Sequence, residues 1–252
     1  MPRSGRTLKK RNTHGEHVRL DGHAVVPGRA TGHLRFGSEG AAPLDIPPWS
    51  VVAVRTLAEF AAEVGSSRPP PVAWVIKEDL RGALGFSLPP LPTVSGVDFE
   101  LLREGDRVDV DGTAGALELP GVTEVPVVTA FLERRDGRIL LMRRSDKVGS
   151  FQGRWAAVSG YVEQRPAREQ AVREVGEETG IHETDLRLER EGAPLRTRQD
   201  DRVYTVHGFR FRVEDPEVRL DWEHTEFEWV HPVEISRRPT VPKLGEVWAL
   251  LT

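Results

Sequence analysis

The sequence predicts an α+β protein with two domains. Between residues 20 and 120, apolar and polar residues mostly alternate over short stretches, as in strands, and a single stretch has helical spacing. Residues 122–252 contain further strands, a highly charged helix and a helix at the end of the chain. Pro120 and Gly121 interrupt the apolar pattern between these regions, which predicts a domain boundary.

Composition indicates a globular protein that does not enter a membrane. Hydrophobic residues make up 38% of the chain and charged residues 29%. No apolar run approaches the roughly 20 residues that cross a bilayer. The absence of cysteine excludes a disulfide framework, thiol catalysis and a cysteine-ligated zinc. No apolar segment follows the basic N-terminus, so we expect no signal peptide and a cytoplasmic location.

Residues 1–19 are predicted to form a basic, disordered tail, because six basic residues face one glutamate without apolar periodicity. The tail is short and lacks aromatic residues, and the whole chain carries a net charge of −4. Nucleic acid is therefore not the expected partner, and an RNA-associated factor is the weakest of three functional hypotheses.

The first domain, residues 20–120, is predicted to consist mainly of strands. We expect strands at residues 24–26, 33–36, 50–54 and 71–76, and a helix over residues 57–64. Residues 105–112 alternate into an Asp-Gly turn, and residues 114–119 form the returning strand.

The second domain, residues 122–252, is predicted to open with a β-hairpin over residues 126–142, with its turn at Asp136-Gly137. A strand at Trp155 leads into a helix from Pro166, at the first helical position, to Thr179. Gly180 suits a left-handed helix cap. Further strands are expected at residues 204–211 and 227–230, and a final helix over residues 242–251.

Three glutamates share one face of the predicted charged helix. Glu174, Glu177 and Glu178 stand at i, i+3 and i+4, where like charges repel by roughly 0.2–0.5 kcal/mol per pair. Three oxygen ligands on one face suit Mg²⁺ or Mn²⁺ bound beside a substrate phosphate. The spacing alone leaves a solvated helix end as the alternative.

Residues 173–181 read Arg-Glu-Val-Gly-Glu-Glu-Thr-Gly-Ile, which resembles the second half of the Nudix box, G-x5-E-x7-R-E-U-x-E-E-x-G-U with U aliphatic. Residues 155–163 are similar to the strand and glycine turn that enter the box. The first half departs from the pattern, because counting back from Arg173 places Ser159 at the box glycine and Arg165 at the box glutamate. Using Gly160 as the box glycine requires deleting one residue, and Glu163 is then the only nearby carboxylate. This departure concerns loop geometry and substrate choice more than metal binding.

The resemblance implies a Nudix αβα sandwich that cleaves a diphosphate linked to another group with Mg²⁺ or Mn²⁺. The three helix glutamates match the metal ligands of the family. Arg173 matches the box arginine that braces them, and Glu169, four residues earlier, would brace Arg173 in turn.

Attack by water also needs a general base outside the helix. A segment near the C-terminus resembles the loop and strand that supply a further carboxylate in many Nudix enzymes. Glu223 is the first choice for the base and Glu226 the second, while Glu178 or Glu174 are alternatives. His224 is expected to be a surface residue or a hydrogen-bond donor.

Basic residues flank the box on its N-terminal side. Arg143, Arg144 and Arg154, with Lys147, are candidate donors to a diphosphate, although they would equally suit a solvated strand end. Trp155 is expected to pack in the core and not to stack on a base.

Three glycine-rich segments of the first domain, residues 27–32, 92–96 and 105–115, resemble the swivelling β/β/α mobile domain of phosphoenolpyruvate-utilising enzymes. In that family a phosphorylated histidine stands eleven residues before the proline that matches Pro92, and this sequence has Arg81 there. Arginine does not accept a phosphoryl group as imidazole does. We interpret the domain as a scaffold or ligand-binding remnant without phosphotransfer.

The leading hypothesis is a metal-dependent Nudix pyrophosphohydrolase that acts on a nucleoside-diphosphate-type substrate. The alternative is a Nudix module that binds a nucleotide or nucleotide sugar as a sensor or regulator. A small nucleotide is the expected partner in both, and a homodimer is left open. The sequence does not identify the substrate.

Overall fold

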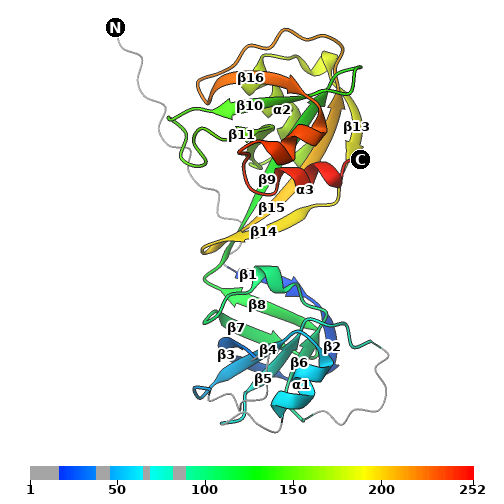
Figure 1. Ribbon diagram of the computed structural model, residues 1–252. Coiled ribbons are helices and arrows are strands. Elements are labelled where there is room, and N and C mark those ends of the chain that lie inside the picture. Colours follow the sequence, from blue (N-terminus) through cyan, green and yellow to red (C-terminus); the bar gives the residue numbers. More distant parts are fainter. Residues whose placement is uncertain (1–16, 38–45, 65–68, 82–88) are drawn as a thin grey trace. The chain divides into compact units, whose positions relative to one another are not determined.

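The computed structural model describes residues 17–37, 46–64, 69–81 and 89–252, and the chain divides into two compact units (Figure 1). The N-terminal unit runs to Glu124 and also includes residues 198–203. The C-terminal unit contains residues 125–197 and 204–252. Most of the predicted tail lies outside the described residues, but residues 17–19 already belong to a strand, so the predicted tail is wrong there.

The N-terminal unit is built on one eight-stranded sheet with the order β1-β8-β7-β3-β4-β5-β6-β2. Strands β3 to β6 pair in parallel, and the other pairs are antiparallel. The elements are β1 (His17–Asp21), β2 (His23–Val26), β3 (Arg29–Phe36), β4 (Ser50–Val54), α1 (Leu57–Val64), β5 (Ala73–Ile76), β6 (Thr93–Ser95), η1 (Phe99–Leu101), β7 (Arg107–Asp111) and β8 (Ala116–Pro120).

The two outer strands of this sheet, β1 and β2, are consecutive in the chain and are joined by Gly22. The amide of Gly22 donates to the Gly115 carbonyl at 2.8 Å, and a Cβ at position 22 would lie 2.5 Å from the Ser95 carbonyl oxygen. Glycine is therefore required where the chain passes from one sheet edge to the other.

Helix α1 covers part of this sheet, as its apolar spacing predicted. Phe60 meets Trp74 of β5 edge to face, with the ring centroids 4.9 Å apart, in a cluster that also contains Val52 and Ile76. Aromatic pairs favour this arrangement because the positive ring edge faces the negative ring face. The contact fixes the helix on the parallel part of the sheet.

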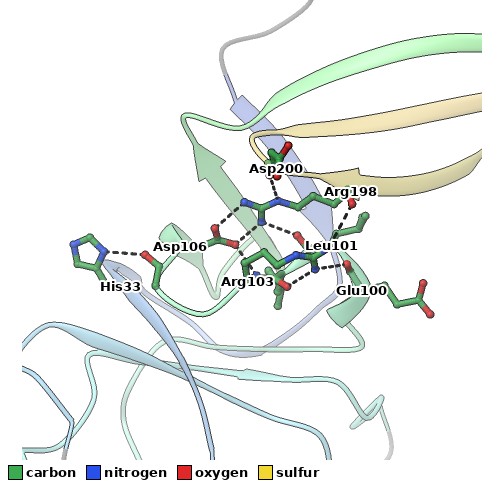
Figure 2. Close-up of polar contacts among 9 residues, drawn as sticks. His33, Glu100, Leu101, Arg103, Asp106, Arg198 and Asp200 are labelled. Atoms are coloured by element: carbon green, nitrogen blue, oxygen red, sulfur yellow. Dashed lines mark hydrogen bonds and ion pairs between the residues drawn. The ribbon is translucent and has the colours of Figure 1, made fainter. Parts of the chain in front are cut away.

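Arg198 contributes a buried ion pair to the N-terminal unit (Figure 2). Its side chain is 5% exposed, and the guanidinium donates to both carboxylate oxygens of Asp106 and to the Leu101 carbonyl. The Arg103 amide also donates to Asp106, at 2.8 Å. The two charges are thus hydrogen-bonded as well as paired, which a buried ion pair requires to offset its desolvation cost.

The C-terminal unit contains a second eight-stranded sheet, whose main path is β11-β10-β9-β15-β13. Strand β12 pairs with β9, β14 with β15 and β16 with β10. The elements are β9 (Thr123–Glu133), β10 (Ile139–Arg144), β11 (Trp155–Ala156), β12 (Val158–Tyr161), α2 (Ala167–Thr179), η2 (Glu183–Asp185), β13 (Arg187–Glu191), β14 (Leu195–Gln199), β15 (Arg202–Arg212), β16 (His224–Val230), η3 (Pro232–Arg237) and α3 (Leu244–Ala249).

Two separate clusters of apolar side chains form the core of this unit. One joins α2, through Ala171 and Val175, to Phe209 and Phe211 of β15. The other joins α3, through Val247, to a group that includes Trp155, which is 8% exposed. The predicted α+β class and the core position of Trp155 are confirmed. No helix among the described residues is long and apolar enough to span a membrane.

Some predicted element bounds differ from the structure. Pro166 is the N-cap of α2 and not its first helical residue. The last helix begins at Leu244, because Lys243 adopts a left-handed conformation with φ of 63°. Strands β13 and β14 were not predicted, since they are rich in charged residues and lack the period-two apolar pattern that identifies a half-buried strand.

Replacing Asp106 with alanine is expected to lower the free energy of unfolding by about 3–5 kcal/mol, because the buried Arg198 guanidinium would lose its counter-charge. Urea denaturation followed by tryptophan fluorescence would measure the change. Asp21→Ala, which removes the exposed partner of Arg19, is the control and should cost less than about 1 kcal/mol. Equal losses in the two variants would contradict this role of Asp106.

Candidate functional site

Helix α2 ends as the sequence predicted. Gly180 has φ of 73°, and its amide donates to the Gly176 carbonyl at 3.1 Å. A left-handed residue at this point ends the helix without the steric cost of a Cβ. The last turn, which carries Glu177 and Glu178, therefore has a defined end.

Two of the three predicted metal ligands, Glu174 and Glu178, are buried on α2 beside β12. Glu174 is 7% exposed, and its Oε1 accepts a hydrogen bond of 2.6 Å from Nε2 of Gln170. A Cβ at Gly160 would lie 2.2 Å from the Glu174 carboxyl carbon. Gly160 thus leaves the space in which the Glu174 carboxylate lies.

Glu178 is the less well satisfied of the two carboxylates. It is 3% exposed, and its Oε1 lies 3.3 Å from the amide of Ser159. Its Oε2 is buried without a hydrogen-bond partner in the described part of the chain. Burial, followed by the charges of Glu174 and Glu223, raises the pKa of Glu178 well above the ordinary value of 4.5.

This arrangement fits a divalent cation. A buried carboxylate oxygen without a donor, next to a second buried carboxylate, offers the hard oxygen ligands that Mg²⁺ and Mn²⁺ prefer. A cation would also remove the like-charge repulsion that raises the pKa of Glu178. Within the described ranges, however, no three acidic or histidine side chains converge as a metal-binding group.

The third glutamate, Glu177, is turned away from this pair. It is 41% exposed and accepts a hydrogen bond of 2.8 Å from Nε of Arg173. Arg173 also reaches Glu163, at 3.2 Å, and this ion pair replaces the expected one with Glu169. These carboxylates raise the pKa of Arg173. Glu163 therefore supplies a carboxylate on the loop before α2, although counting back from Arg173 places Arg165 at the position of the box glutamate.

The segment around Glu223 approaches the helix from another part of the chain. The Asp221 amide donates to the Glu178 carbonyl at 3.3 Å, and the Glu223 amide donates to Asp221 Oδ1 at 2.9 Å. The negative charge of Glu223 contributes to the raised pKa of Glu178, after burial and the charge of Glu174. Glu226 lies instead on β16, where it pairs with Arg143 at 2.8 Å.

His224 is buried, so the surface position offered by the sequence is wrong, while the other alternative, a hydrogen-bond donor, agrees with its contact to Asp221. Its side chain is 1% exposed, with Nδ1 3.3 Å from Asp221 Oδ1 and Nε2 3.8 Å from Glu178 Oε2. Burial lowers the pKa of His224, and Asp221 opposes that shift. Neither Asp221 nor His224 had a periodicity or composition signal in the sequence that indicated this contact. The strand irregularity that directs His224 inward depends on the pairing of β16 with β10.

The predicted phosphate-binding arginines are engaged within the protein. Besides its pair with Glu226, Arg143 donates to the Gly153 carbonyl at 3.2 Å. Arg144 donates to the Ser150 carbonyl and Arg154 to the Thr240 carbonyl, both at 3.0 Å. The charge of Arg144 acts on His224. Arg144 is also the register partner of His224 in the β10–β16 pair, whereas Arg154 bonds to Thr240.

Glu178→Gln is expected to stabilise the metal-free protein near neutral pH by on the order of 1–3 kcal/mol. The pKa of Glu178 is raised in the folded protein. Its contribution to the free energy of unfolding is therefore fully present below the ordinary pKa of 4.5, and it is lost as pH rises through the folded-state pKa. Glutamine resembles the protonated form at every pH. Urea unfolding in EDTA between pH 4 and 8 should show a smaller decline for the variant, and superimposable profiles would contradict the assignment.

Comparison with known proteins identifies the C-terminal region. The NUDIX domain profile matches residues 123–251, just over half of the chain. An octanoyltransferase of Myxococcus xanthus is 35% identical over 167 residues, which cover 64% of this chain and 43% of that protein. The chain thus spans less than half the length of this curated relative.

Two solved structures also show similarity to about half of this chain. A MutT protein from Methanosarcina mazei Go1 is 26% identical and covers 50% of this chain and 91% of its own, with a TM-score of 0.45. A C. elegans Ap4A hydrolase is 20% identical and covers 50% of this chain and 93% of its own, with a TM-score of 0.44. Since the profile match takes in the helix glutamates, the glycine cap and the whole sheet of the C-terminal unit, the chain belongs to the Nudix family.

Proposed function

We propose that the C-terminal unit hydrolyses a diphosphate linkage in a nucleoside-diphosphate-type substrate with Mg²⁺ or Mn²⁺. The observation that supports this most directly is the buried pair Glu174 and Glu178, in which Glu178 Oε2 has no hydrogen-bond partner among the residues that the structure describes. A structural helix gains nothing from two buried like charges, since each pays a desolvation cost. A cation-binding site, by contrast, uses such carboxylates as ligands.

Glu174 and Glu178 would hold the cation, and Glu177 is the third candidate ligand. A bound divalent cation neutralises the phosphate oxygens and lowers the pKa of an attacking water. Arg173 acts as a positioning residue for the last turn of α2, because it joins Glu177 on the helix to Glu163 on the preceding loop. Its side chain is not expected to contact the substrate.

Glu223 is the proposed general base. It belongs to a loop whose amides bond to the helix end and to Asp221, and its charge reaches Glu178. A carboxylate held there can accept a proton from a water beside Glu174 and Glu178. Glu226 is a poorer candidate because its partner is Arg143 on the neighbouring strand.

Arg144 is the favoured diphosphate-binding residue among the predicted arginines. Its register partner on β16 is the buried His224, and its guanidinium has donors besides the Nε that bonds to the Ser150 carbonyl. Arg143 and Arg154 remain candidates for a peripheral contact. The substrate is proposed only as a class, a nucleotide with a linked diphosphate.

A nucleotide sensor or regulator is the second candidate function. The observation that favours it is the altered first half of the box, with Ser159 and Arg165 where the family pattern has glycine and glutamate. Ser159 contributes its amide to Glu178, so the change leaves the carboxylates in place. The protein would bind a nucleotide without hydrolysing it if the loop in this altered half of the box no longer directed water to the phosphorus atom.

For the N-terminal unit we propose a swivelling-type scaffold or ligand-binding domain without phosphotransfer. Arg81 stands where the resembling family has its histidine, and both its backbone amide and its guanidinium bond to Asp79. Asp79 has a pKa of about 2, chiefly because of that side-chain hydrogen bond. A paired arginine at this position supports a structural function.

Mn²⁺ binding tests the metal assignment. Glu178→Gln is expected to weaken binding by roughly tenfold or more, because it removes a charged oxygen ligand from a buried site. Glu177→Gln should weaken it less, since Glu177 lies apart with Arg173. Isothermal calorimetry measures both, with the exposed Glu183→Gln as a matched control. Wild-type affinity in a Glu177→Gln/Glu178→Gln double variant would remove the metal site from the proposal.

Turnover tests the hydrolase against the sensor. With Mg²⁺ and a panel of nucleotides, Glu223→Gln should lower kcat by ~10²–10⁴-fold while nucleotide affinity changes little. Glu226→Gln is the control and should retain turnover, because Glu226 serves the pair with Arg143. Loss of turnover in Glu226→Gln alone would move the base to that residue. Tight nucleotide binding by a wild type that never hydrolyses would favour the sensor.

A further inference from the structure

The carboxylate of Glu178 lies between two groups from different strands. Oε1 lies 3.3 Å from the Ser159 amide of β12, and Oε2 lies 3.8 Å from Nε2 of His224 on β16. Both side chains are almost fully buried, and neither Oε2 nor Nε2 has a hydrogen-bond partner in the part of the chain that the structure describes. The carboxylate is therefore bracketed at both oxygens.

The imidazole of His224 is itself held in place. Its Nδ1 lies 3.3 Å from Oδ1 of Asp221, and the Asp221 amide donates to the main-chain carbonyl of Glu178. Asp221 Oδ1 also accepts from the Glu223 amide, at 2.9 Å. Glu178, Asp221 and His224 thus form a closed ring of contacts that ties the start of β16 to the end of α2.

We propose that His224 is a positioning residue, which fixes the Glu178 carboxylate in the orientation required to bind a divalent cation. This inference rests on the proposed function, because it concerns the same carboxylate. Partners behind a ligand commonly orient it and tune its affinity for the metal. Asp221 and His224 are the partners that would orient Glu178 in this way.

The chemistry of the buried ring supports this role over simple packing. A buried imidazole with an unpaired Nε2 carries a desolvation penalty, which an apolar ring of similar size avoids. If His224 only filled space, His224→Phe would leave the protein stable and its metal affinity unchanged. If His224 orients Glu178, the same substitution releases the carboxylate while the packing is kept.

The test compares Mn²⁺ affinity by calorimetry in the full-length wild type and in His224→Phe, His224→Gln, Asp221→Asn and His182→Phe. Urea unfolding in EDTA is recorded for each variant as a measure of folding. His224→Phe is expected to weaken Mn²⁺ binding by about 10–100-fold. Asp221→Asn should weaken it less, and His224→Gln should recover part of the loss through its amide. His182→Phe replaces an exposed histidine and should bind as the wild type does.

Turnover on the nucleotide panel provides the second readout. For any substrate found, His224→Phe should lower kcat at fixed Mg²⁺ while the KM for nucleotide stays within about twofold. A folded His224→Phe variant with wild-type Mn²⁺ affinity would overturn the inference. If that variant does not fold, wild-type affinity in Asp221→Asn overturns it instead.

The outcomes separate this inference from the proposed function. If the wild type binds no Mn²⁺, the metal-dependent function fails and the role of His224 fails with it. If the wild type binds Mn²⁺, His224→Phe does not and no nucleotide is hydrolysed, the positioning role stands while the hydrolase proposal falls. If turnover is found and the His224 variants match the wild type, only this inference is wrong.

Discussion

The site depends on two carboxylates buried side by side on α2. Glu174 and Glu178 lose hydration and repel each other, so the surrounding residues must supply what water no longer does. Gln170 donates to one carboxylate and the Ser159 amide to the other, and among the described residues Glu178 Oε2 has no donor. Gly160 provides the space for this arrangement. The proposed cation site rests on this oxygen.

Sheet register brings the other parts of the site to these carboxylates. Ser159 lies opposite Thr129 in the β12–β9 pair. At the start of β16 the register shifts, so that Arg143 faces Glu226 and Arg144 faces His224. An irregularity of this kind redirects side chains at the end of a strand. His224 is thereby directed toward Glu178, while Glu226 stays at the surface with Arg143.

Charged side chains are paired differently in the two units. Arg198 and Asp106 in the N-terminal unit pair through two hydrogen bonds, and the Leu101 carbonyl and the Arg103 amide add further bonds to the pair. In the C-terminal unit, Arg173 is similarly shared between Glu163 and Glu177 on the outside of α2. On the inner side of α2, Glu178 Oε2 is buried without a hydrogen-bond partner among the described residues, and His224 Nε2 lies 3.8 Å from it.

The sequence by itself determined the α+β class, helix α2 with its glycine cap, the hairpin at Gly137 and the acidic residues of the candidate site. These features follow from local periodicity and turn chemistry, which act over a few residues. Only the tertiary structure decided that Glu177 pairs with Arg173, that Glu163 replaces Glu169, and that His224 is buried. Arg173 and Glu177 stand four residues apart on one helix, but the contacts of Glu163 and His224 join segments that sequence spacing does not relate. A strand irregularity and a missing Cβ at Gly160 determine which side chains meet there.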